Sequence, residues 1–187
     1  RRDGGNLFWN VQARTAAYDD RITRGNGAMR TQAGFNGVVT REWPRRGDWQ
    51  FETEWSLGLR GGVRSDTPVG WSGSFEATRH FGDALNVEVW VGHVMDQEFL
   101  VWQQDNLVSG FQMNRYDLSA SLNWNIGTRH ELRVKLEALG LDADNPRPWR
   151  IAADGRAQAS NDLVESFSLR NLGFQVRYRY ELAPLSN

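Results

Sequence analysis

The chain has 187 residues, 40% of them hydrophobic and 12% aromatic, a composition that supports a folded domain and excludes disorder. Its 22 basic and 23 acidic residues give a formal net charge of -1 without a basic stripe, which excludes an electrostatic binder of nucleic acid. The mean hydropathy is -0.61, and no run of residues approaches the roughly 20 apolar positions of a spanning helix, which excludes a helical membrane protein.

Alternation of apolar and polar residues is the main structural signal, and it recurs along the chain. Over residues 49–60 the odd positions are mostly apolar and the even positions polar, as in a strand, whose successive side chains point to opposite faces. In chain order, the same alternation predicts strands over residues 7–17, 33–39, 49–60, 69–77, 85–91, 116–124, 132–138 and 172–180. Ahead of the last strand, Phe167 and Leu169 are out of phase, which predicts a β-bulge at residues 170–171.

The connections between these strands alternate between short and long. Short turns are predicted at residues 43–48, 81–84 and 125–129, and long loops at 18–28, 61–68, 93–112 and 142–162. Transmembrane barrels have this asymmetry, and their tilted strands need about 9 to 11 residues to cross the bilayer. The sequence therefore predicts an all-β fold: an antiparallel up-and-down transmembrane β-barrel in the bacterial outer membrane, with about eight strands in this chain and others elsewhere.

Two alternatives to this fold stay open. In a soluble sandwich the apolar faces would meet, and Trp55, Phe75 and Val89 would be sealed between two sheets. About eight strands also suffice to close a small barrel with a packed interior.

Tryptophan and tyrosine residues near the predicted strand ends favour the membrane. They are Trp9, Trp49, Trp124, Tyr178 and Tyr180. Such rings lie at the headgroup level of a bilayer, although aromatic residues also favour strands in general.

Two stretches of the chain resemble a known family. They are residues 18–25, with the pattern Asp-Asp-Arg-x-Thr-Arg-Gly, and the ending from Val176 to Ser186. Both resemble a family of Gram-negative envelope proteins in which a periplasmic module, similar to family 9 carbohydrate-binding modules, precedes a C-terminal outer-membrane barrel domain. The resemblance implies that residues 1–187 are a fragment of that barrel domain, without the N-terminal module and a final strand. It also implies the lipid bilayer as a partner, with glycan and other envelope proteins as further candidates.

The densest charge group in a predicted loop comprises Asp19, Asp20, Arg21 and Arg24. These side chains are candidates for contact with a sugar, a cation or a partner protein. The alternative is an internal salt-bridge network that folds the loop back over the barrel mouth, since structural ion-pair networks are common.

The polar faces of the predicted strands carry the residues expected to line a lumen. These are Glu52, Glu54, Arg60, Glu76, Glu88, Arg133 and Arg177. Glu52 and Glu54 also have a spacing compatible with a glycosidase carboxylate pair. Because any acidic pair two residues apart on a strand has that spacing, we expect them instead to face arginines across the lumen.

No catalytic or metal-binding pattern is legible in the sequence. The three histidines lack the spacing of a zinc motif, and residues 142–146 depart from a calcium loop because proline occupies the fifth position. Ser72 lies within a predicted strand and not in a nucleophile elbow. We therefore expect no catalytic residue, metal or cofactor, and a non-enzymatic role in passage or docking of envelope material, carbohydrate included. The alternatives are a scaffold subunit of a larger outer-membrane complex and a surface hydrolase.

Overall fold

The structure, a computed structural model, describes residues 4–59, 62–63 and 68–182, and all regular secondary structure among them is β. In chain order the strands are β1 (Asn6–Arg14), β2 (Ala17–Asp19), β3 (Met29–Thr31), β4 (Gly34–Glu42), β5 (Trp49–Leu59), β6 (Val69–Phe81), β7 (Leu85–Gln104), β8 (Leu107–Ile126), β9 (His130–Ile151), β10 (Ala157–Ala159) and β11 (Phe167–Tyr180). Within the described ranges, a search for helices long and apolar enough to cross a membrane found none.

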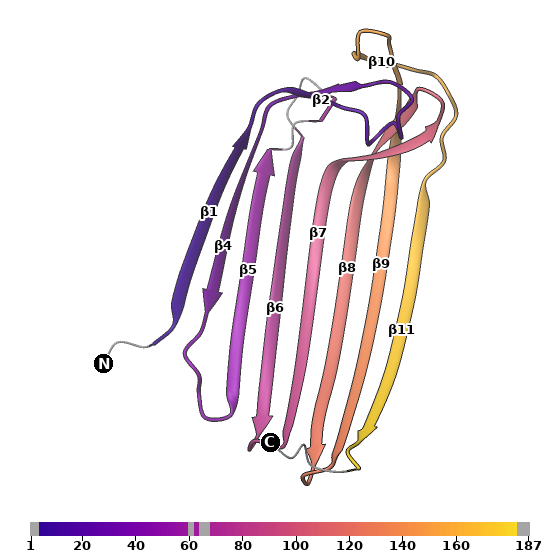
Figure 1. The fold of residues 1–187 in the computed structure, drawn as a ribbon. Coiled ribbons are helices and arrows are strands. Elements are labelled where there is room, and N and C mark those ends of the chain that lie inside the picture. The colour runs from indigo at the N-terminus through magenta and orange to yellow at the C-terminus, as the bar shows by residue number, and fades with distance from the viewer. Residues whose placement is uncertain (1–3, 60–61, 64–67, 183–187) are drawn as a thin grey trace.

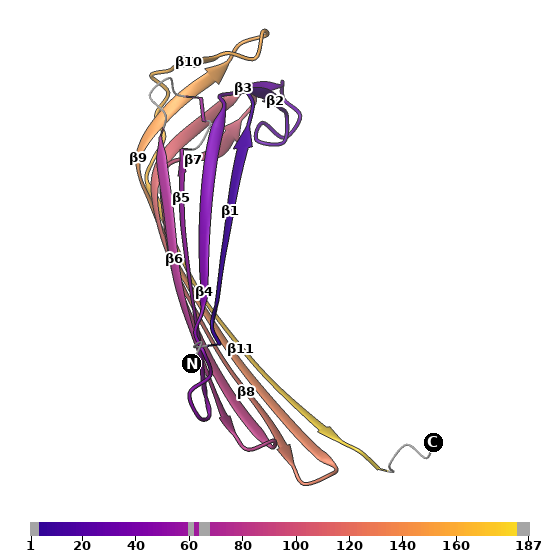
Figure 2. The ribbon, with the colours of Figure 1, turned by 90° about the vertical axis from the view of Figure 1, so that its left-hand side faces the viewer.

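Eight strands form one continuous antiparallel meander in the order β1-β4-β5-β6-β7-β8-β9-β11. The meander is a single curved layer, as Figures 1 and 2 show from two sides. Strand β10 pairs with the far end of β9, and β2 and β3 form a separate hairpin. Within the described residues β1 pairs only with β4 and β11 only with β9, so the sheet has two open edges. The predicted all-β, antiparallel, up-and-down architecture is confirmed at this level.

Short turns gather at one end of the sheet and long connections at the other (Figure 1). The short turns include Gly47, Gly82 and Gly127, which have φ values of 60°, 62° and 66°. Glycine adopts this left-handed conformation without the steric cost that a Cβ would add. The predicted asymmetry of the connections is therefore present in the fold.

Two predicted long loops are instead strand. Residues 93–112 continue β7 and β8 as a hairpin that turns at residues 105–106, and residues 142–151 continue β9. The register shifts between Asp96 and Phe99 and again between Gly110 and Gln112. Each irregularity moves the following side chains out of phase, so a search for strict alternation ends the strand too early.

The predicted bulge at residues 170–171 is wrong. Strand β11 pairs with β9 residue by residue from Phe167 to Tyr180 without a register shift. Phe167 and Leu169 are simply on the opposite face from Leu172, and the ring of Phe167 meets Phe111 edge-on at a centroid distance of 5.2 Å. The surroundings of the strand change along its length, while its backbone does not.

The end of the sheet with the long connections is called the cap, and it comprises residues 17–31, 94–113 and 139–167. Two hydrophobic clusters form the core of the cap. One cluster has Phe111, Met113, Leu141 and Ala143 as its buried members. The other has Met29, Val108 and Ile151. Buried apolar side chains from several connections make the cap a packed unit with its own core.

Connections from distant strands meet within the cap. The Arg30 amide of β3 donates to the Gly155 carbonyl in the turn after β9, at 2.8 Å. Gly155 has a φ of 81°, and a Cβ there would lie 2.6 Å from the carbonyl oxygen of Ala28 and 2.7 Å from the ring of Tyr18. Since β3 precedes β4, and β4 and β9 are separated by four strands in the sheet, the cap spans the sheet from near one edge to near the other.

Candidate functional site

One face of the sheet is apolar and exposed. Residues directly opposite on paired strands share a face, and this places Trp55, Phe75 and Val89 on the same side, together with their apolar cross-strand neighbours. Their exposed fractions are 59%, 43% and 39%. No second sheet covers them within the part of the chain that the structure describes, so these residues do not form a sandwich by themselves.

The other face carries the residues predicted to line a lumen. Glu52 lies opposite Glu76, and Arg133 lies opposite Arg177. Glu54 and Glu88 belong to the same face, because Glu54 is opposite Ser74 and Glu88 is opposite Ser121. Arg60 lies outside the described residues. The register thus brings six of the seven predicted residues to one polar face.

Charge on the polar face is sorted by strand. Its acidic side chains on β4 to β7 are Glu42, Glu52, Glu54, Glu76 and Glu88, and its basic side chains on β9 and β11 are Arg133, Lys135, Arg177 and Arg179. Strand β8 lies between the two groups and contributes Ser119, Ser121 and Asn123, with the ion pair of Arg115 and Asp117 nearer the cap. Glu131 and Glu137 on β9 share the face with the basic residues. The face therefore has an acidic half on β4 to β7 and a basic half on β9 and β11, whose net positive charge comes from Arg177 and Arg179.

Arg133, one of the predicted lumen arginines, and Lys135 beside it pair locally. Arg133 Nε donates to Glu131 at 2.6 Å, and Lys135 pairs with Glu137 at 2.7 Å. Glu54 accepts a hydrogen bond from the Thr40 hydroxyl at 3.1 Å. The charge of Arg133 is thus compensated by its own strand.

The loop group at residues 19–24 is organised by its backbone. The Arg21 amide donates to the carboxylate of Asp19 at 2.8 Å, and the hydroxyl of buried Thr23 donates to the carbonyls of Asp20 and Gly27. The Arg24 guanidinium lies 4.8 Å from the centroid of the Trp102 ring in the extended β7–β8 hairpin. These contacts attach the loop to the cap, and the predicted ligand contact of its charged side chains stays a prediction.

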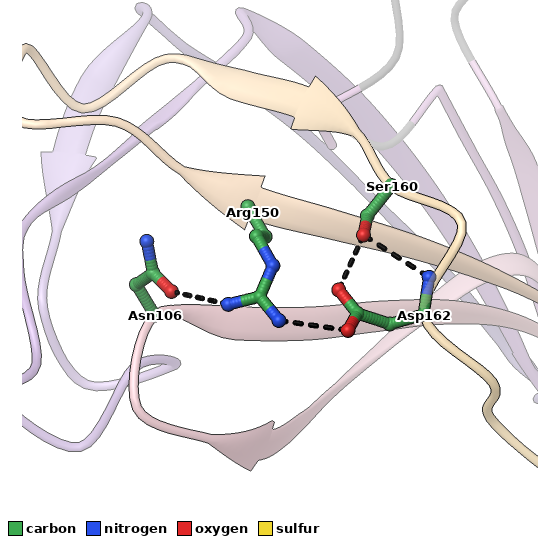
Figure 3. Close-up of polar contacts among 4 residues, drawn as sticks. All are labelled: Asn106, Arg150, Ser160 and Asp162. Carbon is green, nitrogen blue, oxygen red and sulfur yellow. Dashed lines mark hydrogen bonds and ion pairs between the residues drawn. The ribbon is translucent and has the colours of Figure 1, made fainter.

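A polar network that the sequence analysis missed joins three connections of the cap (Figure 3). Arg150 donates to Asp162 at 2.7 Å and to the side-chain carbonyl of Asn106 at 3.2 Å, while Ser160 donates to the other oxygen of Asp162. Asn106 in turn donates to the carbonyl of Ile151 at 2.9 Å. Because these residues are up to 56 positions apart in the chain (from 106 to 162), no local motif announces the network.

Hydrogen bonds within this network shift two pKa values. The hydrogen bonds from Arg150 and then Ser160 lower the pKa of the Asp162 carboxyl, and the hydrogen bond to Asp162 raises the pKa of Arg150. Both shifts favour the charged forms. The network is therefore complete while Asp162 is ionised.

We expect the connection after β10 to loosen in acid. A carboxyl whose pKa is lowered by folding stabilises the fold above its unfolded pKa, near 3.8, and this contribution is lost as the pH falls through the lower folded value. A nitroxide on Leu163→Cys, in a chain without cysteine, should give a broad spectrum at pH 5 and a sharper one at pH 3. With Asp162→Asn added, the spectrum should be sharp at both pH values, and a pH response equal to that of the parent would contradict the assignment.

Residues considered for chemistry lie in structural positions. Ser72 lies within β6, its hydroxyl 2.6 Å from that of Ser56, and Asp142 accepts two hydrogen bonds from Arg170 at 2.7 and 2.9 Å. His93 is stacked on Tyr116 at a centroid distance of 4.4 Å and meets Trp71 edge-on at 4.8 Å. Among the described residues no group of three or more histidine, aspartate or glutamate side chains is placed to hold a metal ion.

Several grooves on the sheet have room for a ligand, and two adjoining ones lie on the polar face between β7 and β11. One has a volume of about 350 Å³ and is lined by Glu88, Ser119, Ser121, Asn123, Arg133, Val134, Lys135, Gln175 and Arg177. A second, of about 280 Å³, adjoins it at Ser119 and includes Trp90 and Asn171. In comparisons with known proteins, no family model, no curated sequence and no solved structure matches the chain.

Proposed function

We propose that this chain forms part of the wall of an outer-membrane β-barrel, with its apolar face against lipid and its polar face toward an aqueous interior. The observation that carries the proposal is the single-layer sheet with an exposed apolar face. Contiguous apolar patches larger than a few hundred Å² are rare on soluble monomers, because such surface costs about 25 cal/mol per Å² in water. A bilayer would cover the whole face at once.

Aromatic residues at two levels of the apolar face support this proposal. At the short-turn end Trp124 lies opposite Leu85, and at the cap end Tyr116 lies opposite His93. The eight residue steps from Leu85 to His93 span about 26 Å along the strand at 3.3 Å per residue. With a tilt of about 40° this gives a band close to 20 Å in height, near the roughly 25 Å of transmembrane barrels.

The proposed role is non-enzymatic: passage or docking of envelope material through or at the barrel. The long connections would face outward and the short turns the periplasm. The open edges at β1 and β11 would pair with further strands of a larger barrel, as the resemblance to the envelope family implies. Because the meander has an even number of strands, its edge strands β1 and β11 run antiparallel to each other, which suits closure in an up-and-down barrel.

Single cysteines test the membrane assignment. Because the chain has no cysteine, Leu57→Cys on the apolar face and Ser72→Cys on the polar face can each be labelled alone. In the complete protein inserted into lipid vesicles, an environment-sensitive fluorophore on Leu57→Cys should be quenched by brominated acyl chains. Ser72→Cys should react with a water-soluble maleimide and resist that quenching. Equal behaviour of the two sites would remove the proposal.

A plugged docking scaffold is the second candidate, favoured by the packed cap at the long-connection end. Planar bilayers distinguish it from a pore. Ion conductance by the inserted protein would support passage, whereas lipid quenching without conductance would support docking.

A further inference from the structure

The basic half of the polar face offers a cation that the fold does not use. Arg177 lies directly opposite Arg133 on the neighbouring strand, and like charges in this position repel each other. Arg133 is compensated by Glu131 and Lys135 by Glu137. Within the described part of the chain, no ion pair or side-chain hydrogen bond is formed by Arg177.

Neutral polar groups lie next to this cation, and Glu88 lines the same groove from β7. Asn123 is opposite Arg133, and in the adjacent row Ser121 is opposite Lys135, which is opposite Gln175. Amide and hydroxyl groups both donate and accept hydrogen bonds, as the hydroxyls of a sugar require. A guanidinium binds carboxylate or phosphate oxygens with two parallel hydrogen bonds.

A flat aromatic surface adjoins these groups. Trp90 lies over Gly92, where a Cβ would come 2.5 Å from the indole ring, so the ring lies against the backbone of its own strand. Trp90 is opposite Ser119, the residue shared by the two grooves. An aromatic ring in this setting offers an apolar surface to a ligand whose other groups are polar.

The acidic half of the face sets the charge of the ligand. Glu42, Glu52 and Glu76 lie opposite one another on three adjacent strands. Their field repels anions from that side and favours the half of the face that carries Arg177. We therefore expect an anionic ligand on the β9 and β11 side of the face.

We infer that the two grooves that meet at Ser119, one lined by Arg133, Lys135 and Arg177 and the other by Trp90, together bind an acidic carbohydrate, a sugar that carries carboxylate or phosphate groups. The anionic group lies at Arg177, the hydroxyls at Ser121, Asn123 and Gln175, and a sugar ring on Trp90. The combined volume of the grooves, about 350 and 280 Å³, is in the range of small-ligand sites. The inference rests on the proposed function only in requiring that the polar face be open to water.

Titration of the complete protein in detergent tests this inference independently of membrane location. The probes are a galacturonate trisaccharide, the neutral galactose trisaccharide and glucose 6-phosphate, followed by calorimetry. We expect at least one acidic sugar to bind about tenfold or more tightly than the neutral one. Tight binding of the uronate assigns a carboxylated glycan, and tight binding of the phosphosugar alone assigns a phosphorylated one. Equal affinity for the acidic and neutral sugars would overturn the inference.

Arginine variants distinguish binding in the groove from a general effect of the protein's charge. Arg177→Gln should weaken acidic-sugar binding about ten- to a hundredfold, as expected for a lost charge-assisted hydrogen bond, and Arg177→Lys should restore part of it. The control Arg156→Gln removes the same charge from the cap, where Arg156 pairs with Asp154, and should leave affinity unchanged. Unchanged affinity in a folded Arg177→Gln protein would overturn the assignment, even if the lipid-quenching result for Leu57→Cys stands.

Discussion

Arginine in place of Val89 should lower the stability of the inserted protein by about 2 to 4 kcal/mol. Val89 is on the apolar face, 39% exposed, opposite Ala77 on one neighbouring strand and Ala120 on the other. It lies midway between Leu85 and His93, so in a bilayer the guanidinium would lie near the middle of the hydrocarbon, far from the headgroups to which it could extend. Urea unfolding in lipid vesicles, followed by tryptophan fluorescence, measures the change.

Ser74→Arg is the matched control for this prediction. Ser74 precedes Phe75 on β6, faces the polar side and lies opposite Glu54. Its arginine would meet water and a carboxylate, so we expect a change within about 0.5 kcal/mol, as for ordinary surface substitutions. If Val89→Arg proved as mild as Ser74→Arg in lipid, the apolar face would not be in contact with hydrocarbon.

The alternating strands were predictable from sequence because one physical rule governs them. Where a strand has one apolar and one polar side, its composition repeats every two residues, and residues 49–59 follow that rule closely enough to fix both the strand and its faces. The polar-face assignments of Glu52, Glu76 and Arg133 followed directly. The residues that lie opposite them could not be predicted, because they depend on the register between separate strands.

The cap was not predictable in the same way. Phe99, Phe111 and Phe167 lie on the side that is polar elsewhere in the sheet, since a local core replaces water there. Bulges in β7 and β9 interrupt the alternation on the way to this core. A sequence pattern reports the surroundings of a strand only while those surroundings stay constant, and at the cap they change within a few residues.

The candidate site residues also differ in how far the sequence alone revealed them. The charged loop at residues 19–24 was conspicuous in the sequence, and in the structure buried Thr23 and the stacking of Arg24 on Trp102 give it a clear packing role. Arg177 and Trp90 were less conspicuous, because their importance comes from residues on other strands. Candidate sites on a sheet face are defined across strands, and one chain segment seldom reveals them.

Phe111→Ala should disrupt the cap while leaving the eight-stranded sheet in place. Phe111 is 1% exposed, packs with Met113 and Leu141, and meets Phe167 edge-on, so the cavity left behind should cost about 3 to 5 kcal/mol of local stability. Hydrogen exchange of the β7–β8 extension should accelerate accordingly. Leu163→Ala removes a side chain that is 99% exposed in the same region and should change exchange little. Equal protection in the two variants would mean that the cap has no cooperative core, and the docking scaffold would then lose its structural basis.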